Sequence, residues 1–184
     1  MNVTELNTFE SSRLLMKRMR VSDYALINEL LNTDGFIKYI GDRNIRSDED
    51  AKAYIERTLE NQNIQYWVVT VKSEMVQAGI VSLVMRDYLP VRDIGYAFLP
   101  RFMNRGFAFE ASYALMKKLI LDCGMDELLA TPNKSNARSV HLLEKLCFTH
   151  QREIEHEGKV IQVYSINKDD FTRQISLIES RLQH

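Results

Sequence analysis

The amino-acid sequence predicts a mixed α/β domain, in which a sheet carries helices on its faces. Strand-like and helix-like segments follow one another in the order βααβββαβαββα. Three consecutive runs rich in β-branched and aromatic residues stand in the middle of that order and predict an antiparallel meander. The length of 184 residues suits one domain with a sizeable core, so we expect residues 1–184 to form a single domain.

Composition narrows the possible partners. The chain has 24 Lys and Arg against 25 Asp and Glu, so no net charge favours binding to nucleic acid or to an anionic membrane. Cys123 and Cys147 belong to no CxxC motif or Cys/His cluster, which argues against a metal centre or a disulfide framework. The N-terminus lacks an apolar signal region, and no apolar run reaches about 18 residues, so we expect a cytoplasmic protein without membrane association.

The first third of the chain predicts one strand and two helices. Residues 13–19 are β-compatible, and Ser22 and Asp23 then offer an N-cap and an acidic first turn. The helix that follows has one apolar stripe, formed by Leu26, Ile27, Leu30 and Leu31. Ser47 opens a second helix through the capping-box form "SDED". Between the two helices, residues 35–46 are aromatic and contain glycine, which is typical of a packed loop or of one wall of a substrate pocket.

The middle of the chain predicts the meander and the helix after it. The three strands cover residues 66–71, 78–85 and 93–99, with turn residues between them. A helix then begins after Gly106 and meets Gly124, a plausible C-cap; its apolar face is formed by Ala108, Ala111, Leu115 and Leu119.

The last third predicts a short strand, a helix, a hairpin and a final helix. The strand covers residues 127–132 and the helix residues 136–146. Residues 148–154 and 159–166 flank the turn "EHEGK" and form the hairpin. Residues 169–183 form the C-terminal helix, which begins with the acidic pair Asp169 and Asp170.

The junction between the third meander strand and its helix predicts an anion site. The first N–H groups of a helix lack partners, and the helix dipole leaves about half a positive charge there. Gly106 lets the backbone approach a ligand, Asn104 tolerates a left-handed conformation, and Arg105 adds a cation. A single glycine before a helix also suits an ordinary tight turn. The GxxxxGK[ST] and GxGxxG patterns are missing from this turn, which disfavours a P-loop or a Rossmann site.

Two motifs give the chain a family resemblance. Residues 103–108 resemble motif A of the GCN5-related N-acetyltransferases (GNAT family), whose pattern is Gln/Arg-x-x-Gly-x-Gly/Ala; Gly106 and Ala108 match, whereas Met103 replaces the usual Gln or Arg. Residues 136–148, "NARSVHLLEKLCF", resemble motif B, with Cys147 in place of a glycine. The similarity extends through "SRLLMKRM", "SDEDAKAYIER" and "DIGYAFLP", and it is greatest to the branch that includes the ribosomal-protein N-terminal acetyltransferases.

The resemblance implies a fold and a cofactor site. The implied fold is a splayed, mostly antiparallel sheet flanked by helices, whose fourth and fifth strands part to admit acetyl-CoA. Phe98 and Leu99 would offer backbone groups to the pantetheine amides, and Asn136 would contact the pantetheine arm. The turn that would bind the pyrophosphate consists of Asn104, Arg105, Gly106, Phe107 and Ala108.

The same resemblance implies an acetyl-CoA-dependent N-acetyltransferase that acts by direct attack in a ternary complex. We expect Asp93 to take the amine proton through water; the structural alternative is a strand-end charge that pairs with Arg92 or Arg86 or is simply solvated. Leu143 stands where many relatives have a proton-donating Tyr, so Ser139 is the expected acid for the thiolate, unless it merely caps its helix. A backbone N–H of residues 98–99 would meet the oxyanion.

The acceptor is the least specified part of the prediction. Phe36, Tyr39 and Tyr96 are the candidates to line its pocket, and the acceptor is a primary amine, either a protein N-terminus or a small molecule. The four histidines show no metal-ligand spacing, so we expect no metal. The oligomeric state is expected to be a monomer or a homodimer. An acyl-CoA-binding module that has lost catalysis is the alternative function, because of Met103 and the missing Tyr.

Overall fold

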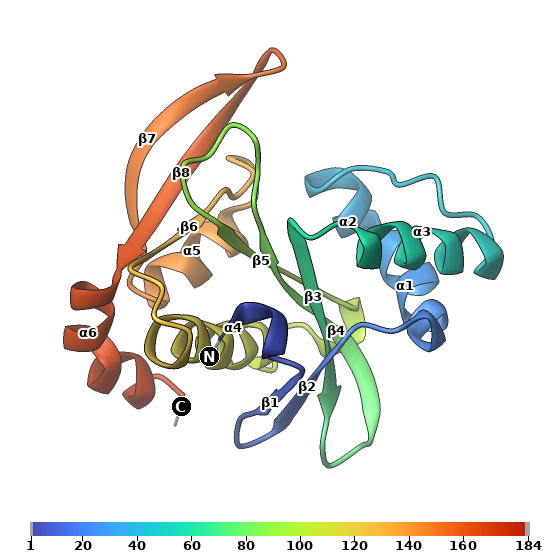
Figure 1. The fold of residues 1–184 in the computed structure, drawn as a ribbon, viewed down its shortest axis with the longest axis horizontal. Coiled ribbons are helices and arrows are strands. Elements are labelled where there is room, and N and C mark those ends of the chain that lie inside the picture. The colour runs from blue at the N-terminus through green and yellow to red at the C-terminus, as the bar shows by residue number, and fades with distance from the viewer. Residues whose placement is uncertain (1, 183–184) are drawn as a thin grey trace.

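The computed structural model describes residues 2–182, which form one eight-stranded sheet with helices packed on it (Figure 1). The strands are β1 (Thr8–Glu10), β2 (Leu14–Arg18), β3 (Ile64–Val71), β4 (Val76–Val84), β5 (Asp93–Phe98), β6 (Glu127–Ala130), β7 (Thr149–His156) and β8 (Lys159–Asn167). They lie in the order β1-β2-β3-β4-β5-β6-β8-β7. Every neighbouring pair is antiparallel except β5 and β6, which confirms the predicted mixed α/β fold with its mostly antiparallel sheet.

The helices occupy most of the predicted positions. They are α1 (Tyr24–Leu31), α2 (Asp34–Tyr39), α3 (Asp48–Glu60), α4 (Phe107–Lys117), α5 (Ala137–Lys145) and α6 (Lys168–Ser180). The apolar stripe predicted for α1 is buried, and α4 continues through a π-helical turn toward Gly124, whose φ of +71° suits the predicted C-cap. The expected C-terminal helix ended at residue 183, which lies outside the described residues.

Two short elements differ from the expectation. Strand β1 was not predicted, because three residues at a sheet edge are too few to show a two-residue alternation. Helix α2 overlaps the start of the segment 35–46, which was expected to be a packed loop or a pocket wall. It begins where the Thr33 hydroxyl accepts the Phe36 N–H at 3.3 Å. Its six residues include Gly35, whose low helix propensity hid the helix from sequence reasoning.

The helices divide between two parts of the sheet. Helix α1 contacts α3 and β4, and α3 contacts β3, so these helices gather beside the centre of the meander (Figure 1). Helix α4 lies between the sheet and α6: it contacts β1, β2, β4 and β5, and the Tyr113 hydroxyl donates to Glu179 of α6 at 2.7 Å. Trp67 is fully buried in the core and donates its indole N–H to the Leu6 carbonyl at 2.7 Å.

Strands β5 and β6 separate soon after they meet. In the described residues they pair at one position, Asp93 with Leu129. On its other edge β5 pairs with β4 along its whole length, and the Leu99 N–H donates to the Ala78 carbonyl at 2.9 Å. Ladder bonds alternate along an antiparallel strand, so the backbone groups of Tyr96 and Phe98 point away from β4, toward the opening. No helix of residues 2–182 is long and apolar enough to cross a membrane.

Candidate active site

The opening between β5 and β6 leads into a cavity of about 720 Å³. Five segments supply its walls: α1, α2, the end of β5, the turn before α4 with the first residues of that helix, and α5. Of the predicted site residues, the cavity brings together Phe36, Tyr39, Tyr96, Phe98, Asn104, Gly106, Phe107, Ala108, Asn136 and Ser139. Asp93, Leu99 and Arg105 do not line it.

The turn before α4 has the backbone that an anion site needs. Asn104 and Gly106 have φ values of +60° and +77°, in the left-handed region where Asn and Gly are tolerated best. The first α-helical hydrogen bond runs from the Glu110 N–H to the Gly106 carbonyl at 3.0 Å. The N–H groups of Phe107 and Ala108 precede that bond, so the helix gives them no acceptor. They lie at the cavity wall together with the positive end of the helix dipole.

The side chains beside this turn have different places. The Arg105 guanidinium pairs with Glu74 and lies 4.6 Å from the centre of the Phe107 ring, so it is engaged outside the cavity. Met103, which stands where the family usually has Gln or Arg, is 38% exposed and lines the cavity. The Met103 side chain therefore gives the cavity an apolar surface at a position where the family usually has a polar side chain.

Strand β5 offers the backbone groups of Phe98 to a ligand, as expected, together with those of Tyr96 in place of Leu99. The sequence pointed to Phe98 and Leu99, for the pantetheine amides and for the oxyanion. The Leu99 N–H is already bonded to Ala78, and Leu99 is fully buried. The N–H and C=O groups that face the opening are those of Tyr96 and Phe98, because hydrogen bonding alternates along the strand. Sequence reasoning could not find this, since the register of β5 on β4 decides it.

Helix α5 and strand β5 bring two hydroxyl groups together inside the cavity. The Asn136 side-chain carbonyl accepts the Ser139 N–H at 3.2 Å and caps the helix, which leaves the Asn136 NH₂ group free to point to a ligand. The Ser139 hydroxyl lies 2.8 Å from the Tyr96 hydroxyl. Burial raises the pKa of Tyr96 to about 12, so its phenol is protonated at neutral pH. The sequence suggested Tyr96 as a pocket wall and gave no sign of this pair.

Asp93 lies at the closed end of the opening, where β5 meets β6. Its Oδ2 accepts from Arg86 Nε at 2.9 Å and from the Thr131 hydroxyl at 2.8 Å, and the residue is 2% exposed. The structure thus shows the Arg86 pairing that the sequence left open. Asp93 Oδ1 is buried, and no described residue donates to it. Burial raises the pKa of the carboxyl, and Arg86 opposes that shift. Asp93 and Tyr96 are three positions apart on one strand, so their side chains point to opposite faces of the sheet.

The far wall of the cavity is apolar, and its rim is basic. Phe36, Tyr39 and Ile40 of the α2 region form the apolar wall, and Ile40 is 46% exposed. Two cations from α5, Arg138 and Lys145, line the rim, whereas no Asp or Glu of residues 2–182 belongs to the lining. Sequence reasoning missed both cations as site residues. Their spacing of seven residues, which puts them on one face of the helix, was the signal that could have found them.

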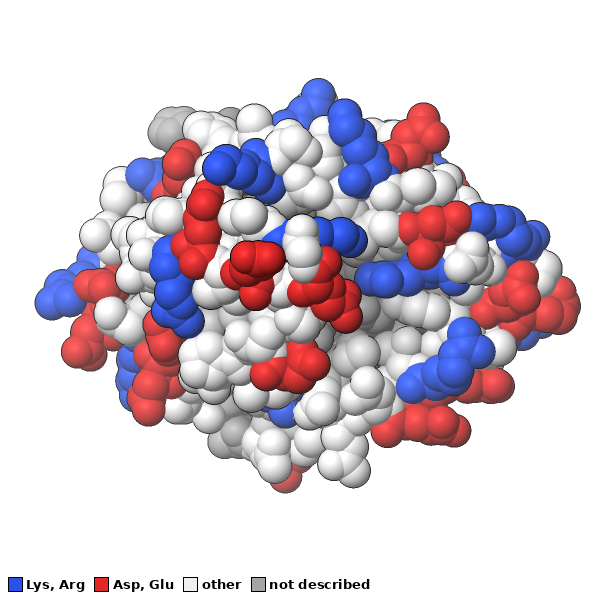
Figure 2. Space-filling model, turned by 90° about the horizontal axis from the view of Figure 1, so that it is seen from above, with Lys and Arg blue, Asp and Glu red and all other residues white. Residues whose placement is uncertain are grey.

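Charged side chains of both signs are mixed on another face of the molecule. Figure 2 shows acidic and basic side chains interspersed over the face that it presents. Among residues 2–182, no group of three or more His, Cys, Asp or Glu side chains could hold a metal ion.

Comparison with known proteins agrees with this geometry. The family model for the acetyltransferase (GNAT) domain matches residues 13–149. An uncharacterized N-acetyltransferase, YnaD, from Bacillus subtilis (strain 168) is 24% identical over 136 residues, which cover 74% of this chain and 79% of YnaD.

Two solved structures share the fold. One is RimL, a ribosomal L7/L12 alpha-N-protein acetyltransferase in complex with coenzyme A, with a TM-score of 0.76, 15% identity, and coverage of 89% of this chain and 99% of that one. The other is spermidine N-acetyltransferase from Vibrio cholerae in complex with CoA and spermine, with a TM-score of 0.74, 15% identity, and coverage of 88% and 99%. Because the family model spans most of the chain, the protein belongs to the GNAT family and is an acetyl-CoA-dependent N-acetyltransferase.

Proposed function

We propose that the protein transfers acetyl from acetyl-CoA to the primary amine of an apolar acceptor, by direct attack in a ternary complex. The observation that carries this proposal is the shared cavity. It joins the unbonded N–H groups at the start of α4, the backbone of Tyr96 and Phe98, and the Tyr96 and Ser139 hydroxyl pair. One ligand that reaches from a diphosphate to a thioester would use all three.

The proposed position of acetyl-CoA follows from these groups. The diphosphate lies against the N–H groups of residues 106–108, where the helix dipole favours an anion. The pantetheine arm extends between β5 and α5, with the backbone of Phe98 on one side and the Asn136 NH₂ group on the other. A backbone N–H of Tyr96 or Phe98 meets the thioester oxygen, which takes up negative charge during attack.

The cavity lining supports an apolar acceptor with one amine. A polyamine carries several positive charges. It would meet the apolar side chains of α2 and the cations Arg138 and Lys145, and no carboxylate of residues 2–182 lines the cavity to pair with it. A protein N-terminus with an apolar first residue, or a small aromatic amine, would instead pack against Phe36 and Tyr39. Of the acetylated amines named for the two similar structures, a protein N-terminus therefore fits this cavity better than spermidine.

Two groups are proposed to handle the protons. Asp93 does not line the cavity and points to the other face of the sheet from Tyr96, so it is proposed to take the amine proton through a chain of water molecules that ends at its unbonded Oδ1. Ser139, supported by Tyr96, acts on the departing sulfur. A Tyr96 pKa of about 12 is far above the ~8.5 of a free thiol, so full proton transfer from this pair to the thiolate is uphill. We therefore propose that the pair donates a hydrogen bond to the sulfur, rather than serving as the acid expected from the sequence.

A panel of acceptors tests the proposal. Free thiol release from acetyl-CoA is measured with 2-phenylethylamine, a peptide with an apolar N-terminal residue, and spermidine. We expect turnover with at least one apolar acceptor and kcat/KM for spermidine at least about ten-fold lower. Preference for spermidine contradicts the acceptor class. CoA binding without thiol release on any acceptor supports the binding module instead.

A further inference from the structure

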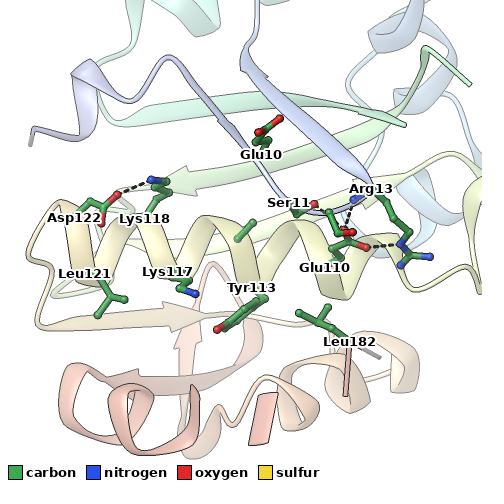
Figure 3. A pocket seen from close by; sticks show the side chains of 12 residues that line it. Glu10, Ser11, Arg13, Glu110, Tyr113, Lys117, Lys118, Leu121, Asp122 and Leu182 are labelled. Carbon is green, nitrogen blue, oxygen red and sulfur yellow. Dashed lines mark hydrogen bonds and ion pairs between the residues drawn. The ribbon is translucent and has the colours of Figure 1, made fainter. Parts of the chain in front are cut away.

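The turn that is proposed to bind the diphosphate is supported from behind by a second set of polar residues. Gly106 lines the 720 Å³ cavity, whereas Arg13 and Glu110 line a separate hollow of about 400 Å³ beside the β1–β2 turn (Figure 3). The backbone of the turn therefore has the proposed ligand on one side and these two side chains on the other.

Glu110 is the fixed point of this set. It is 4% exposed, and its carboxylate receives three hydrogen bonds. Oε1 accepts the Arg13 backbone N–H at 2.8 Å and the Ser11 hydroxyl at 2.7 Å, and Oε2 accepts Arg13 Nε at 2.6 Å (Figure 3). A buried carboxylate with this many donors holds its partners firmly, because a lost bond would leave a buried charge unsatisfied. The first turn of α4 is thereby fastened to the β1–β2 turn.

Arg13 extends this connection to the ligand turn. Its Nη1 donates to the Arg105 carbonyl at 3.0 Å, and its guanidinium carbon lies 4.8 Å from the centre of the Phe107 ring. A Cβ atom added to Gly106 would lie 3.2 Å from Arg13 Nη2, so the guanidinium packs directly behind the glycine.

The orientation of one peptide follows from this contact. The peptide between Arg105 and Gly106 is trans and planar, so its C=O and N–H point in opposite directions. The C=O points to Arg13, and the Gly106 N–H therefore points away from Arg13. Because Gly106 also lines the large cavity, this N–H joins those of Phe107 and Ala108 on the ligand side.

We propose that Arg13, held by Glu110, is a positioning residue that fixes the Arg105–Gly106 peptide for the diphosphate of acetyl-CoA. It acts through the turn and does not touch the ligand. This inference rests on the proposed placement of the diphosphate. Without the Arg13 bond the peptide is free to rotate, and three preorganised donors become two.

The test compares acetyl-CoA with S-acetylpantetheine. Acetyl-CoA carries the diphosphate and the 3′-phosphoadenosine attached to it, whereas S-acetylpantetheine lacks both. We expect Arg13→Met to raise the KM for acetyl-CoA at least about ten-fold, the scale of a hydrogen bond to a charged group, and to leave kcat/KM for S-acetylpantetheine unchanged. Arg13→Lys keeps a cation beside Glu110 but lacks the second arm of the guanidinium, so it should fold like the parent and lose acetyl-CoA affinity several-fold.

A matched control and two contrary outcomes complete the experiment. Arg173→Met removes an exposed arginine that pairs with Asp170 on α6. It should leave the KM for acetyl-CoA and the kcat/KM for S-acetylpantetheine unchanged. Equal losses with both thioesters in Arg13→Lys, or an unchanged KM for acetyl-CoA in both Arg13 variants, overturn the inference. If the parent protein uses acetyl-CoA and S-acetylpantetheine equally well, the turn is not the diphosphate site, and the proposed placement of acetyl-CoA fails first.

Discussion

Replacing Tyr96 by Phe removes a single hydroxyl from the hydrogen-bonded pair with Ser139. The 2.8 Å distance between the two oxygens is that of a well-formed O–H···O bond. In the resting enzyme the pair is neutral, so its loss should lower the free energy of unfolding by about 1 kcal/mol. When the thiolate departs, the pair faces a charge, and a hydrogen bond to a charged group contributes about 1.5–3 kcal/mol. We therefore expect kcat to fall about 10- to 100-fold, with the KM for acetyl-CoA nearly unchanged.

The assay is thiol release at saturating acceptor, with Ser139→Ala and the double variant measured in parallel. Since Tyr96 acts through Ser139, the double variant should be no slower than the slower single one. The high pKa of Tyr96 keeps its phenol protonated over the assay range. In Tyr96→Phe the limbs of the kcat–pH profile should therefore stay at the same pH while the plateau value of kcat falls. Tyr113→Phe, which loses a tyrosine hydrogen bond to Glu179 outside the cavity, is the control. Independent, multiplicative effects of the two substitutions would refute the shared role.

Two further substitutions test other parts of the site, and a third tests the stability of the fold. Gly106→Val places a β-branched residue at φ +77° and against Arg13, so it should raise the KM for acetyl-CoA at least about ten-fold; unchanged affinity in a folded variant would exclude the turn as the diphosphate site. Asp93→Asn should lower kcat about 100-fold. In the parent protein, activity that needs the Asp93 carboxylate falls as the pH drops through its raised pKa, which gives the pH–rate profile an acid limb. Asp93→Asn should remove that limb, and an acid limb that survives the substitution would reject Asp93 as the base. Cys147 has a φ of +64°, so Cys147→Gly should stabilise the protein by about 1 kcal/mol in urea unfolding, and a loss of stability would contradict the strain argument.

Much of the fold could be predicted because its signals are local. The burial of the α1 stripe, the three strands of the meander and the C-terminal hairpin follow from spacing along short stretches. Ser47 accepts the Asp50 N–H at 3.1 Å, as the "SDED" pattern indicated. The Asn104 and Gly106 turn was also readable, since few residues other than Asn and Gly adopt left-handed φ values comfortably.

The chemistry of the site depended on contacts between distant residues. Tyr96 and Ser139 are 43 residues apart, and 97 residues separate Arg13 from Glu110, so no periodicity links them. The Leu99 N–H also depends on a distant contact: it bonds to the Ala78 carbonyl because β5 pairs with β4, so it is not available to a ligand. Asp93 could have been solvated or paired, and the packing of Arg86 and Thr131 decided the outcome.

By itself, the sequence determined most of the helices and strands, although not β1 or α2, and the left-handed turn that precedes α4. Those properties arise from backbone conformation and from side-chain spacing within one segment. Tertiary structure alone decided which backbone groups remain open at the parting of β5 and β6, and which side chains support the turn from behind. Strand register and close packing fix those groups, and both depend on which segments meet in the folded chain.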